Sequence, residues 1–174
     1  MTINFHETIY HSPFGSIFLR ADDDALLELH FVSSEPANSS SLANINFHQH
    51  PILAQTAAWL DQYFAGQKHS PNSHPPLRLN LTPFNVRVLE IASQVPFGQT
   101  MTYGEIAEII AAERNLFKMS AQAVGSAMRK NPICLIVPCH RIIGANGHLG
   151  GYNGEPARKR QLLAHEGIDT TRLV

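Results

Sequence analysis

Short apolar runs of strand length dominate the beginning of the chain. Residues 16–20 and 25–32 are such runs and flank the acidic residues 22–24, an arrangement that predicts a β-hairpin. A polar stretch rich in Ser and Asn follows, and apolar residues over about 52–64 then predict a helix that Gly66 ends. The first part of the chain is therefore expected to be a small sheet with one helix.

After residue 79 the apolar positions recur mostly at helical spacing. They predict one helix between Phe84 and Val95. Thr102 and Glu105 have the spacing of a capping box, which opens a second helix, and Ser120 is a good N-cap for a short third one. About seven residues join the second and third helices, so the pair predicts a helix-turn-helix arrangement.

The end of the chain combines an apolar run, a glycine-rich segment and a last helix. Residues 133–137 form the apolar run and predict a strand, after which Pro138 favours a bend. Several glycines between 144 and 154 predict a loop. Pro156 then favours the start of a helix that Gly167 ends.

Composition and charge divide the chain near Leu79. Residues 68–76 are polar and rich in Pro, which is typical of a linker. Residues 1–79 carry three basic and seven acidic groups, a net charge of −4, whereas residues 80–174 carry ten basic and seven acidic groups, a net charge of +3. We therefore predict two domains and an α+β protein. Its N-terminal domain, 1–79, is a small β-sheet plus helix, and its C-terminal domain, 80–174, is mainly helical with a helix-turn-helix.

The composition also narrows the class of protein. A hydrophobic share of 44% and a charged share of 16% are typical of a globular protein. No apolar run approaches the roughly 20 residues of a membrane span, and no secretory signal is recognisable. Two cysteines cannot form a disulfide framework and fit a reducing compartment, so a cytoplasmic location is expected. The formal net charge of −1 argues against a nucleic-acid partner, but the positive second half is compatible with weak, sequence-independent DNA binding.

Cys139 and His140 are the sharpest candidates for catalysis. A cysteine is nucleophilic as a thiolate, and a nearby imidazole can take its proton. Adjacent strand residues point to opposite faces, so contact requires a bend at Pro138 or a water that relays the proton. The alternative for this dipeptide is a buried packing pair, and Cys134, inside the apolar run, is interpreted as a small buried hydrophobe.

A metal site is not expected from the sequence. The two cysteines lack Cys-x-x-Cys spacing, and the histidines at 48 and 50 lie in a polar stretch without a cysteine nearby. The predicted set of metal ligands is therefore empty.

The short helix that begins at Ala121 carries mostly small side chains. Such a helix approaches another backbone closely, either a neighbouring helix or a nucleic-acid groove. It lacks the long side chains expected of a helix that reads bases in the major groove. If it meets DNA, an approach through the minor groove without sequence readout is expected.

Several short motifs follow one another in the second half of the chain: TPF at 82–84, VPFG at 95–98, TYGE at 102–105, AVGSAMRKNP at 123–132, PCHR at 138–141, GYNG at 151–154 and LLAHEG at 162–167. Together they resemble one family, the O6-alkylguanine-DNA alkyltransferases or methylated-DNA–protein-cysteine methyltransferases. The likeness covers nearly all of residues 80–174, and the first half matches more loosely.

The resemblance implies direct DNA repair. The alkyl group of O6-alkylguanine would pass irreversibly to Cys139, so that each molecule acts once and needs no cofactor. The damaged nucleotide must leave the base stack to reach a buried thiolate. The implied partner is double-stranded DNA, bound in the minor groove without sequence preference, and a monomer is expected. Some members of the family bind zinc through N-terminal cysteines, which this chain lacks.

The resemblance also implies a role for individual residues. Cys139 is the nucleophile, His140 the base acting through a water, Glu166 the carboxylate that orients it, and Asn131 a tie between the helix and the active-site turn. Arg141 matches an ion-pairing arginine. The implied pocket residues are Tyr103, Tyr152, Asn153 and Gly154. The implied DNA-binding residues are Tyr103, Ala121, Gln122, Ala123 and Arg129.

Gln122 departs from the family pattern. The family usually has Arg there, which fills the gap left by the rotated base, and Gln brings no charge and less reach. The stretch before it is about five residues longer than usual, so Arg114 or Lys118 is a candidate substitute charge. This departure keeps open a non-catalytic protein that binds alkylguanine. A thiol hydrolase that uses Cys139 and His140 is the remaining alternative.

Overall fold

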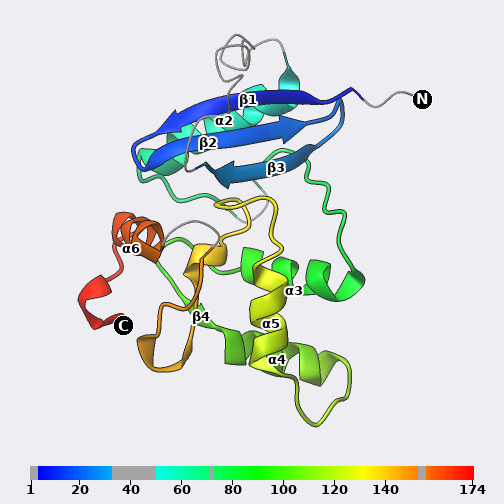
Figure 1. The fold of residues 1–174 in the computed structure, drawn as a ribbon, viewed down its shortest axis with the longest axis vertical. Helices are drawn as coiled ribbons and strands as arrows, with labels where there is room; N and C mark the ends of the chain where they lie inside the picture. Colours follow the sequence, from blue (N-terminus) through cyan, green and yellow to red (C-terminus); the bar gives the residue numbers. More distant parts are fainter. Residues whose placement is uncertain (1–3, 33–49, 71–72, 153–155) are drawn as a thin grey trace. The chain divides into compact units, whose positions relative to one another are not determined.

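The computed structural model describes residues 4–32, 50–70, 73–152 and 156–174, which form two compact units, Met1–Leu79 and Asn80–Val174. Figure 1 shows a sheet and one helix in the first unit and mostly helices in the second. No helix in the described ranges is long and apolar enough to cross a membrane.

The first unit is a three-stranded antiparallel sheet covered on one face by a helix. The strands β1 (His6–Ser12), β2 (Gly15–Ala21) and β3 (Leu26–Phe31) follow one another in space as in sequence. The helix α2 (Pro51–Phe64) packs against β2 and β3 (Figure 1). The core between these two layers contains the completely buried side chains of Leu19, Leu29, Leu53 and Leu60. The burial of such apolar side chains is the main driving force for folding. The predicted hairpin and helix are confirmed, whereas β1 was missed because His6, Glu7 and His11 obscure its alternation.

The turn between β2 and β3 is organised by Asp22. Its Oδ1 accepts hydrogen bonds from the backbone N–H groups of Asp24 and Ala25, at 3.0 and 2.9 Å. Its Oδ2 accepts a hydrogen bond from Arg78, which lies near the end of this unit. The second aspartate, Asp23, consequently lies at the exposed tip of the turn.

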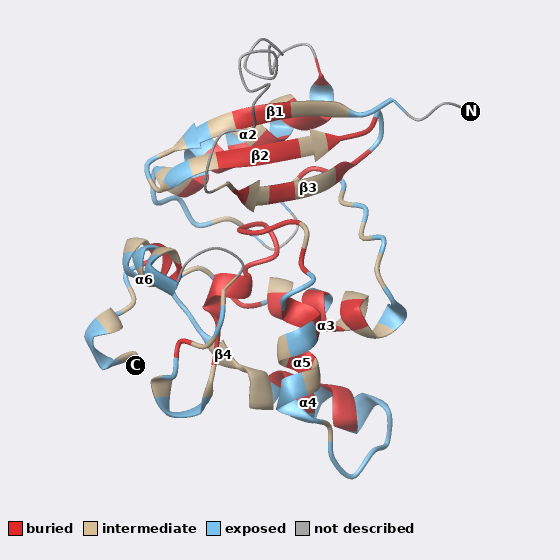
Figure 2. Cartoon of the chain, in the orientation of Figure 1, coloured by how far each residue is buried: buried red, intermediate tan, exposed pale blue. Residues whose placement is uncertain are grey.

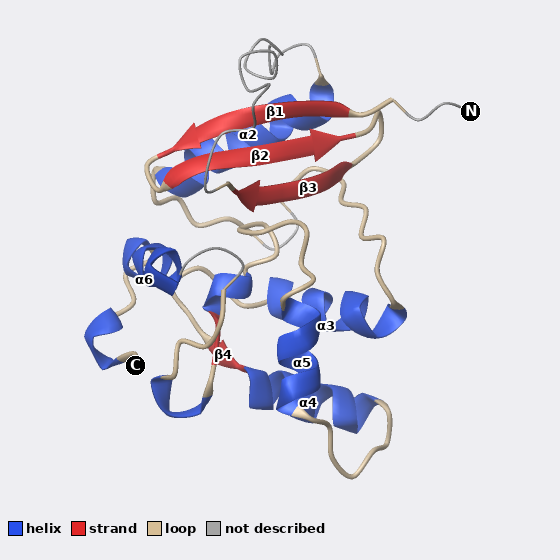
Figure 3. Cartoon of the chain, in the orientation of Figure 1, coloured by secondary structure: helices blue, strands red, loops and turns tan. Residues whose placement is uncertain are grey.

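The second unit is mainly helical (Figure 3). Its elements are α3 (Pro83–Ser93), β4 (Met101–Thr102), α4 (Tyr103–Glu113), α5 (Ala121–Met128), the 3-10 turn η2 (Cys139–Arg141), β5 (Ile142–Ile143), η3 (Ala145–Gly147), α6 (Pro156–His165) and η4 (Thr170–Arg172). The short strands β4 and β5 pair in parallel, and α5 packs against both α3 and α4. The two units together confirm the α+β fold class.

Local capping signals determine where the helix pair begins. The Thr102 hydroxyl accepts from the Glu105 N–H at 3.1 Å, and the Glu105 carboxylate accepts from the Thr102 N–H at 2.7 Å, a complete capping box. The Ser120 hydroxyl accepts from the Gln122 N–H at 3.2 Å and caps α5. Both predicted caps are confirmed.

The strand predicted at residues 133–137 was wrong, because this segment is a buried turn. Leu135 has a φ of 67°, in the left-handed region, and Cys134 and Val137 form an isolated bridge. The Asn131 amide spans the turn, since Nδ2 donates to the Val137 carbonyl at 2.9 Å and Oδ1 accepts from the Ile133 N–H at 3.0 Å. These local partners replace a neighbouring strand, and Figure 2 shows the segment among the buried parts of this unit.

Candidate active site

Cys139 lies at the start of η2, directly after the buried turn. Its side chain belongs to a cavity of about 650 Å³ formed entirely within the second unit. The same cavity is also lined by Tyr103, Tyr152, Ala121, Gln122 and Arg129. The fold therefore brings Cys139 together with residues from α4, α5 and the segment before α6. A volume of this size is typical of a small-molecule site.

His140 lies beside Cys139 in sequence but is held by Glu166. The two side chains are completely buried, and His140 Nε2 lies 2.6 Å from Glu166 Oε1. Burial lowers the pKa of His140, even though the Glu166 carboxylate favours its protonated form. The histidine is therefore a neutral imidazole near pH 7, the form that accepts a proton.

Glu166 also binds Arg141, the residue after His140. Arg141 Nε and Nη2 donate to the two carboxylate oxygens at 2.8 and 3.0 Å, and Nη1 donates to the Val95 carbonyl at 2.7 Å. Although burial alone would raise it, the hydrogen bonds from His140 and Arg141, together with the guanidinium charge, bring the pKa of Glu166 to about 2. Glu166 therefore remains a carboxylate and neutralises a buried guanidinium.

Three neighbours stabilise the thiolate form of Cys139. A hydrogen bond from Cys134 lowers the pKa of Cys139 the most, and burial opposes this effect. A hydrogen bond with Asn131 and the positive charge of Lys159 lower the pKa further. The opposite shift falls on Cys134, whose pKa is raised well above its ordinary value because it is the donor of the pair and is buried. Cys139 is therefore the activated thiol and Cys134 supports it.

Lys159 is the site residue that the sequence analysis missed. It is completely buried in α6, and its Nζ donates to the carbonyls of Ile142 and Leu149 at 2.6 and 2.5 Å. Nζ also lies 5.9 Å from the centre of the Tyr103 ring. Burial lowers the pKa of Lys159 to about 8, while the Cys139 charge favours its protonated form. The signal in the sequence was its position on the same helical face as Leu162 and Leu163, which are also completely buried.

Tyr103 forms one wall of the cavity and is positioned by two glycines. A Cβ at Gly125 would lie 3.9 Å from the ring, and a Cβ at Gly150 would lie 3.2 Å from it. Gly150 also has a φ of 67°, so a side chain there would be both crowded and strained. Burial and the nearby Cys139 charge raise the pKa of Tyr103, which keeps its hydroxyl protonated.

The remaining candidates are placed differently. Ala123 lies in α5 but is not among the lining residues of the cavity, and Asn153 and Gly154 lie outside the described residues. Arg129 is the cation that lines the cavity in the described part of the chain, and its Nη2 donates to Ser126 at 3.1 Å. Neither Arg114 nor Lys118 lines it, and the Arg114 guanidinium lies over the Phe84 ring at 5.4 Å.

Fold and site together define a two-unit protein with an activated cysteine in a cavity beside a helix-turn-helix. The family described as 6-O-methylguanine DNA methyltransferase matches both units, its ribonuclease-like domain over residues 5–77 and its DNA binding domain over residues 83–168. The chain belongs to this family.

Named relatives and solved structures agree with this family. A methylated-DNA–protein-cysteine methyltransferase of Metallosphaera sedula is 38% identical over 158 residues, covering 91% of this chain and 90% of the relative. A protein of the same name from Saccharolobus islandicus is 36% identical over 162 residues, covering 92% and 94%. The crystal structure of Mycobacterium tuberculosis OGT in complex with DNA has a TM-score of 0.75 at 34% identity, covering 97% of this chain and 94% of that one.

Proposed function

We propose that this protein repairs DNA directly, by transferring the alkyl group of O6-alkylguanine to Cys139. The observation that carries the proposal is the Cys139 thiol, which lies in the cavity and whose pKa is lowered by Cys134, Asn131 and Lys159 despite burial. The names of the relatives and the DNA-bound solved structure support the same reaction. DNA that contains alkylated guanine is therefore the substrate.

The proposed transfer is a single displacement at the alkyl carbon. The Cys139 sulfur forms a bond to that carbon, the bond between the carbon and O6 breaks, and guanine leaves with the electron pair. The thiol proton passes through a water to His140, which Glu166 holds in position, and the departing guanine is protonated in turn. The thioether that forms is a poor leaving group, so each molecule acts once.

The helix α5 supports an approach through the minor groove. The exposed residues of this helix are Ala121, Gln122 and Ser126, of which only Gln122 has a long side chain, and the exposed Arg129 follows as its C-cap. A helix with so little bulk can enter a narrow groove closely, while few long side chains are available to read base edges. We infer sequence-independent binding by a monomer. The damaged nucleotide rotates out of the stack into the cavity between Tyr103, Tyr152 and Cys139.

The decisive experiment maps the position of the transferred group. The protein is incubated with a duplex containing O6-methylguanine, digested and analysed by peptide mass spectrometry, with Cys134→Ser and Cys139→Ser as paired variants. We expect one methyl group on the Cys139 peptide of the parent and of Cys134→Ser, and none on Cys139→Ser, which still binds the duplex.

Other outcomes would overturn the proposal. An unmodified parent peptide with retained DNA binding would instead support a non-catalytic damage-binding protein. Repeated turnover without a modified peptide would support a thiol hydrolase.

A further inference from the structure

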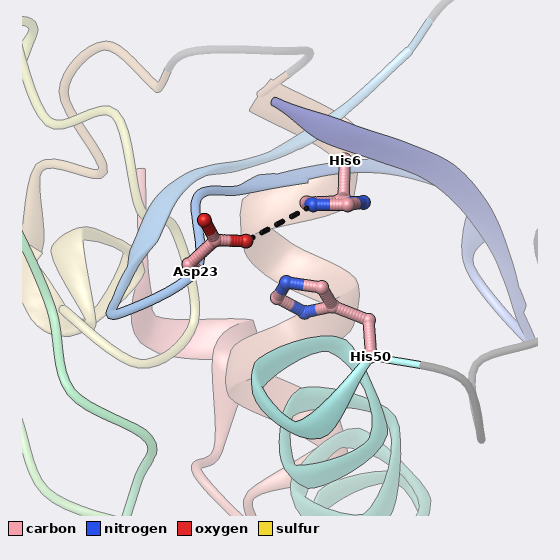
Figure 4. Close-up of side chains that lie close together, drawn as sticks. All are labelled: His6, Asp23 and His50. Atoms are coloured by element: carbon pink, nitrogen blue, oxygen red, sulfur yellow. Dashed lines mark hydrogen bonds and ion pairs between the residues drawn. The ribbon is translucent and has the colours of Figure 1, made fainter. Parts of the chain in front are cut away.

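Histidines gather in the first half of the chain, and the proposed repair reaction uses none of them. Seven of the ten histidines lie within residues 1–79. Two of these, His6 and His50, lie next to Asp23 at one end of the sheet (Figure 4). The three residues come from the start of β1, the turn between β2 and β3, and the N-terminus of α2, all within the first unit.

The three side chains converge on one point. His6 Nε2 lies 3.3 Å from Asp23 Oδ1, and the His6 and His50 rings have centroids 4.2 Å apart. One potential ligand atom from each residue lies within 4.8 Å of the other two. Figure 4 shows the His50 ring below that of His6, with one ring nitrogen facing the Asp23 carboxylate.

The neighbouring acidic groups have other partners, which singles out Asp23. Asp22 caps the turn and binds Arg78, and Asp24 lies 3.7 Å from the same guanidinium. Asp23 turns instead toward His6.

We propose that His6, Asp23 and His50 form a binding site for a divalent transition metal of the zinc type. Two imidazoles and one carboxylate are ligands that such ions accept, and three protein ligands leave a fourth position for water. Zinc lies about 2.1 Å from each ligand, so the ligand atoms must approach one another to roughly 3.4 Å. The observed ligand atoms lie within 4.8 Å of one another, so metal binding requires the side chains to rotate toward one another.

Metal binding at His50 has a structural consequence. The His50 Nδ1 accepts from the Leu53 N–H at 3.5 Å, the outer limit of a hydrogen bond. When the other ring nitrogen binds a metal, Nδ1 carries the proton, and this weak cap is exchanged for a metal bond. The ion then links β1, the β2–β3 turn and α2, three parts of the first unit that are far apart in the sequence.

No metal site was predicted from the sequence, because that prediction rested on cysteine spacing. The proposed ligands His6, Asp23 and His50 are separated by long segments of sequence and include no cysteine, so they do not form a local sequence motif. Only the folded sheet brings the residues together.

Zinc and cobalt binding to the full chain tests the proposal. The background carries Cys134→Ser and Cys139→Ser, so that thiols cannot contribute. Affinity is measured by competition with a chromophoric chelator, and the ligand field by Co²⁺ absorption. We expect one equivalent of metal, and an affinity at least about tenfold lower in His6→Asn and in Asp23→Asn, since even partners behind the ligands cost that much.

Matched controls separate ligands from bystanders. Asp24→Asn and His11→Asn change the same residue types in the same unit, and we expect them to bind as the background does. His6 and Asp23 are not fully buried, so their variants are expected to fold, which circular dichroism verifies. Failure of the background to bind one equivalent, or unchanged affinity in both His6→Asn and Asp23→Asn, would overturn the proposal.

Discussion

The Glu166 carboxylate lies 2.6 Å from His140 Nε2 and also accepts two hydrogen bonds from Arg141. One buried negative charge thus orients the candidate base and neutralises a buried cation. A Gly98 N–H donates to the same carboxylate at 3.1 Å, which ties the end of α6 to the turn after α3. The arrangement stabilises the second unit and, in the proposed reaction, holds the base in position.

Replacing Glu166 with Gln should therefore lower the free energy of unfolding at pH 7. The change keeps the size but leaves Arg141 without its buried counter-charge, and breaking such a pair costs roughly 3–5 kcal/mol. Urea denaturation measures the loss. Glu90→Gln is the control, because its pair with Arg87 is exposed and such pairs contribute little.

The same variant should change how stability depends on pH. The pKa of Glu166 falls from 4.5 to about 2 on folding, so its contribution is complete above pH 4.5 and is lost as the pH falls toward 2. The contribution amounts to roughly 3 kcal/mol. Between these pH values the parent should lose stability more steeply than Glu166→Gln, and parallel curves would contradict this assignment.

Lys159→Met should shift the reactivity of Cys139 to higher pH. The lysine charge lowers the pKa of Cys139, and methionine removes that charge while filling a similar volume. The carbonyls of Ile142 and Leu149 also lose their donor, at a cost of about 1–3 kcal/mol. The rate of methyl transfer from an O6-methylguanine duplex, measured from pH 6 to about 10, tests the shift, with the exposed Lys130→Met as control. A profile that coincides with that of the parent would show that Lys159 is structural alone.

The hydrogen bond from Cys134 to Cys139 can be tested by two matched variants. Cys134→Ala removes the donor, so the pKa of Cys139 should rise and transfer at pH 7 should slow. Cys134→Ser retains a donor of similar size, so the profile should remain close to that of the parent. The pH dependence of Cys139 alkylation by iodoacetamide is the measurement. Equal behaviour of Ala and Ser would assign the effect to packing.

The elements that were predicted correctly depend on local signals. The caps at Thr102 and Ser120 act within three residues of their own helices, so the sequence contains everything needed to place α4 and α5. The motif residues Cys139 and His140 were found because their chemistry is unusual in adjacent positions. Local chemistry is thus sufficient to predict the helix pair, whereas the role of Cys139 as nucleophile is implied by the family resemblance and stays a prediction.

What could not be predicted depends on contacts between distant residues. An apolar run at 133–137 fits a strand or a buried turn equally well, and Asn131 decides between them by bonding to both ends. A lysine on an apolar helix face does not reveal that two backbone carbonyls accept hydrogen bonds from it, as they do from Lys159. His6, Asp23 and His50 converge only after the sheet and α2 have packed.

Gln122→Arg should strengthen DNA binding and make it more sensitive to salt. Gln122 is exposed on α5 and lines the cavity, so an arginine there is placed to contact DNA or to fill the gap left by a rotated base. One added phosphate contact steepens the dependence of log K on log salt by about 0.9. Fluorescence anisotropy with an O6-methylguanine duplex at several salt concentrations measures this slope, and single-turnover transfer measures the repair rate. Lys118→Gln is the control for charge outside the cavity, and we expect it to leave the repair rate of bound DNA unchanged.

Arg129→Gln should reduce both affinity and rate, because Arg129 is the cation that lines the cavity in the described part of the chain. If Gln122→Arg gains nothing while Arg129→Gln loses both, Arg129 already supplies the charge that Gln122 lacks.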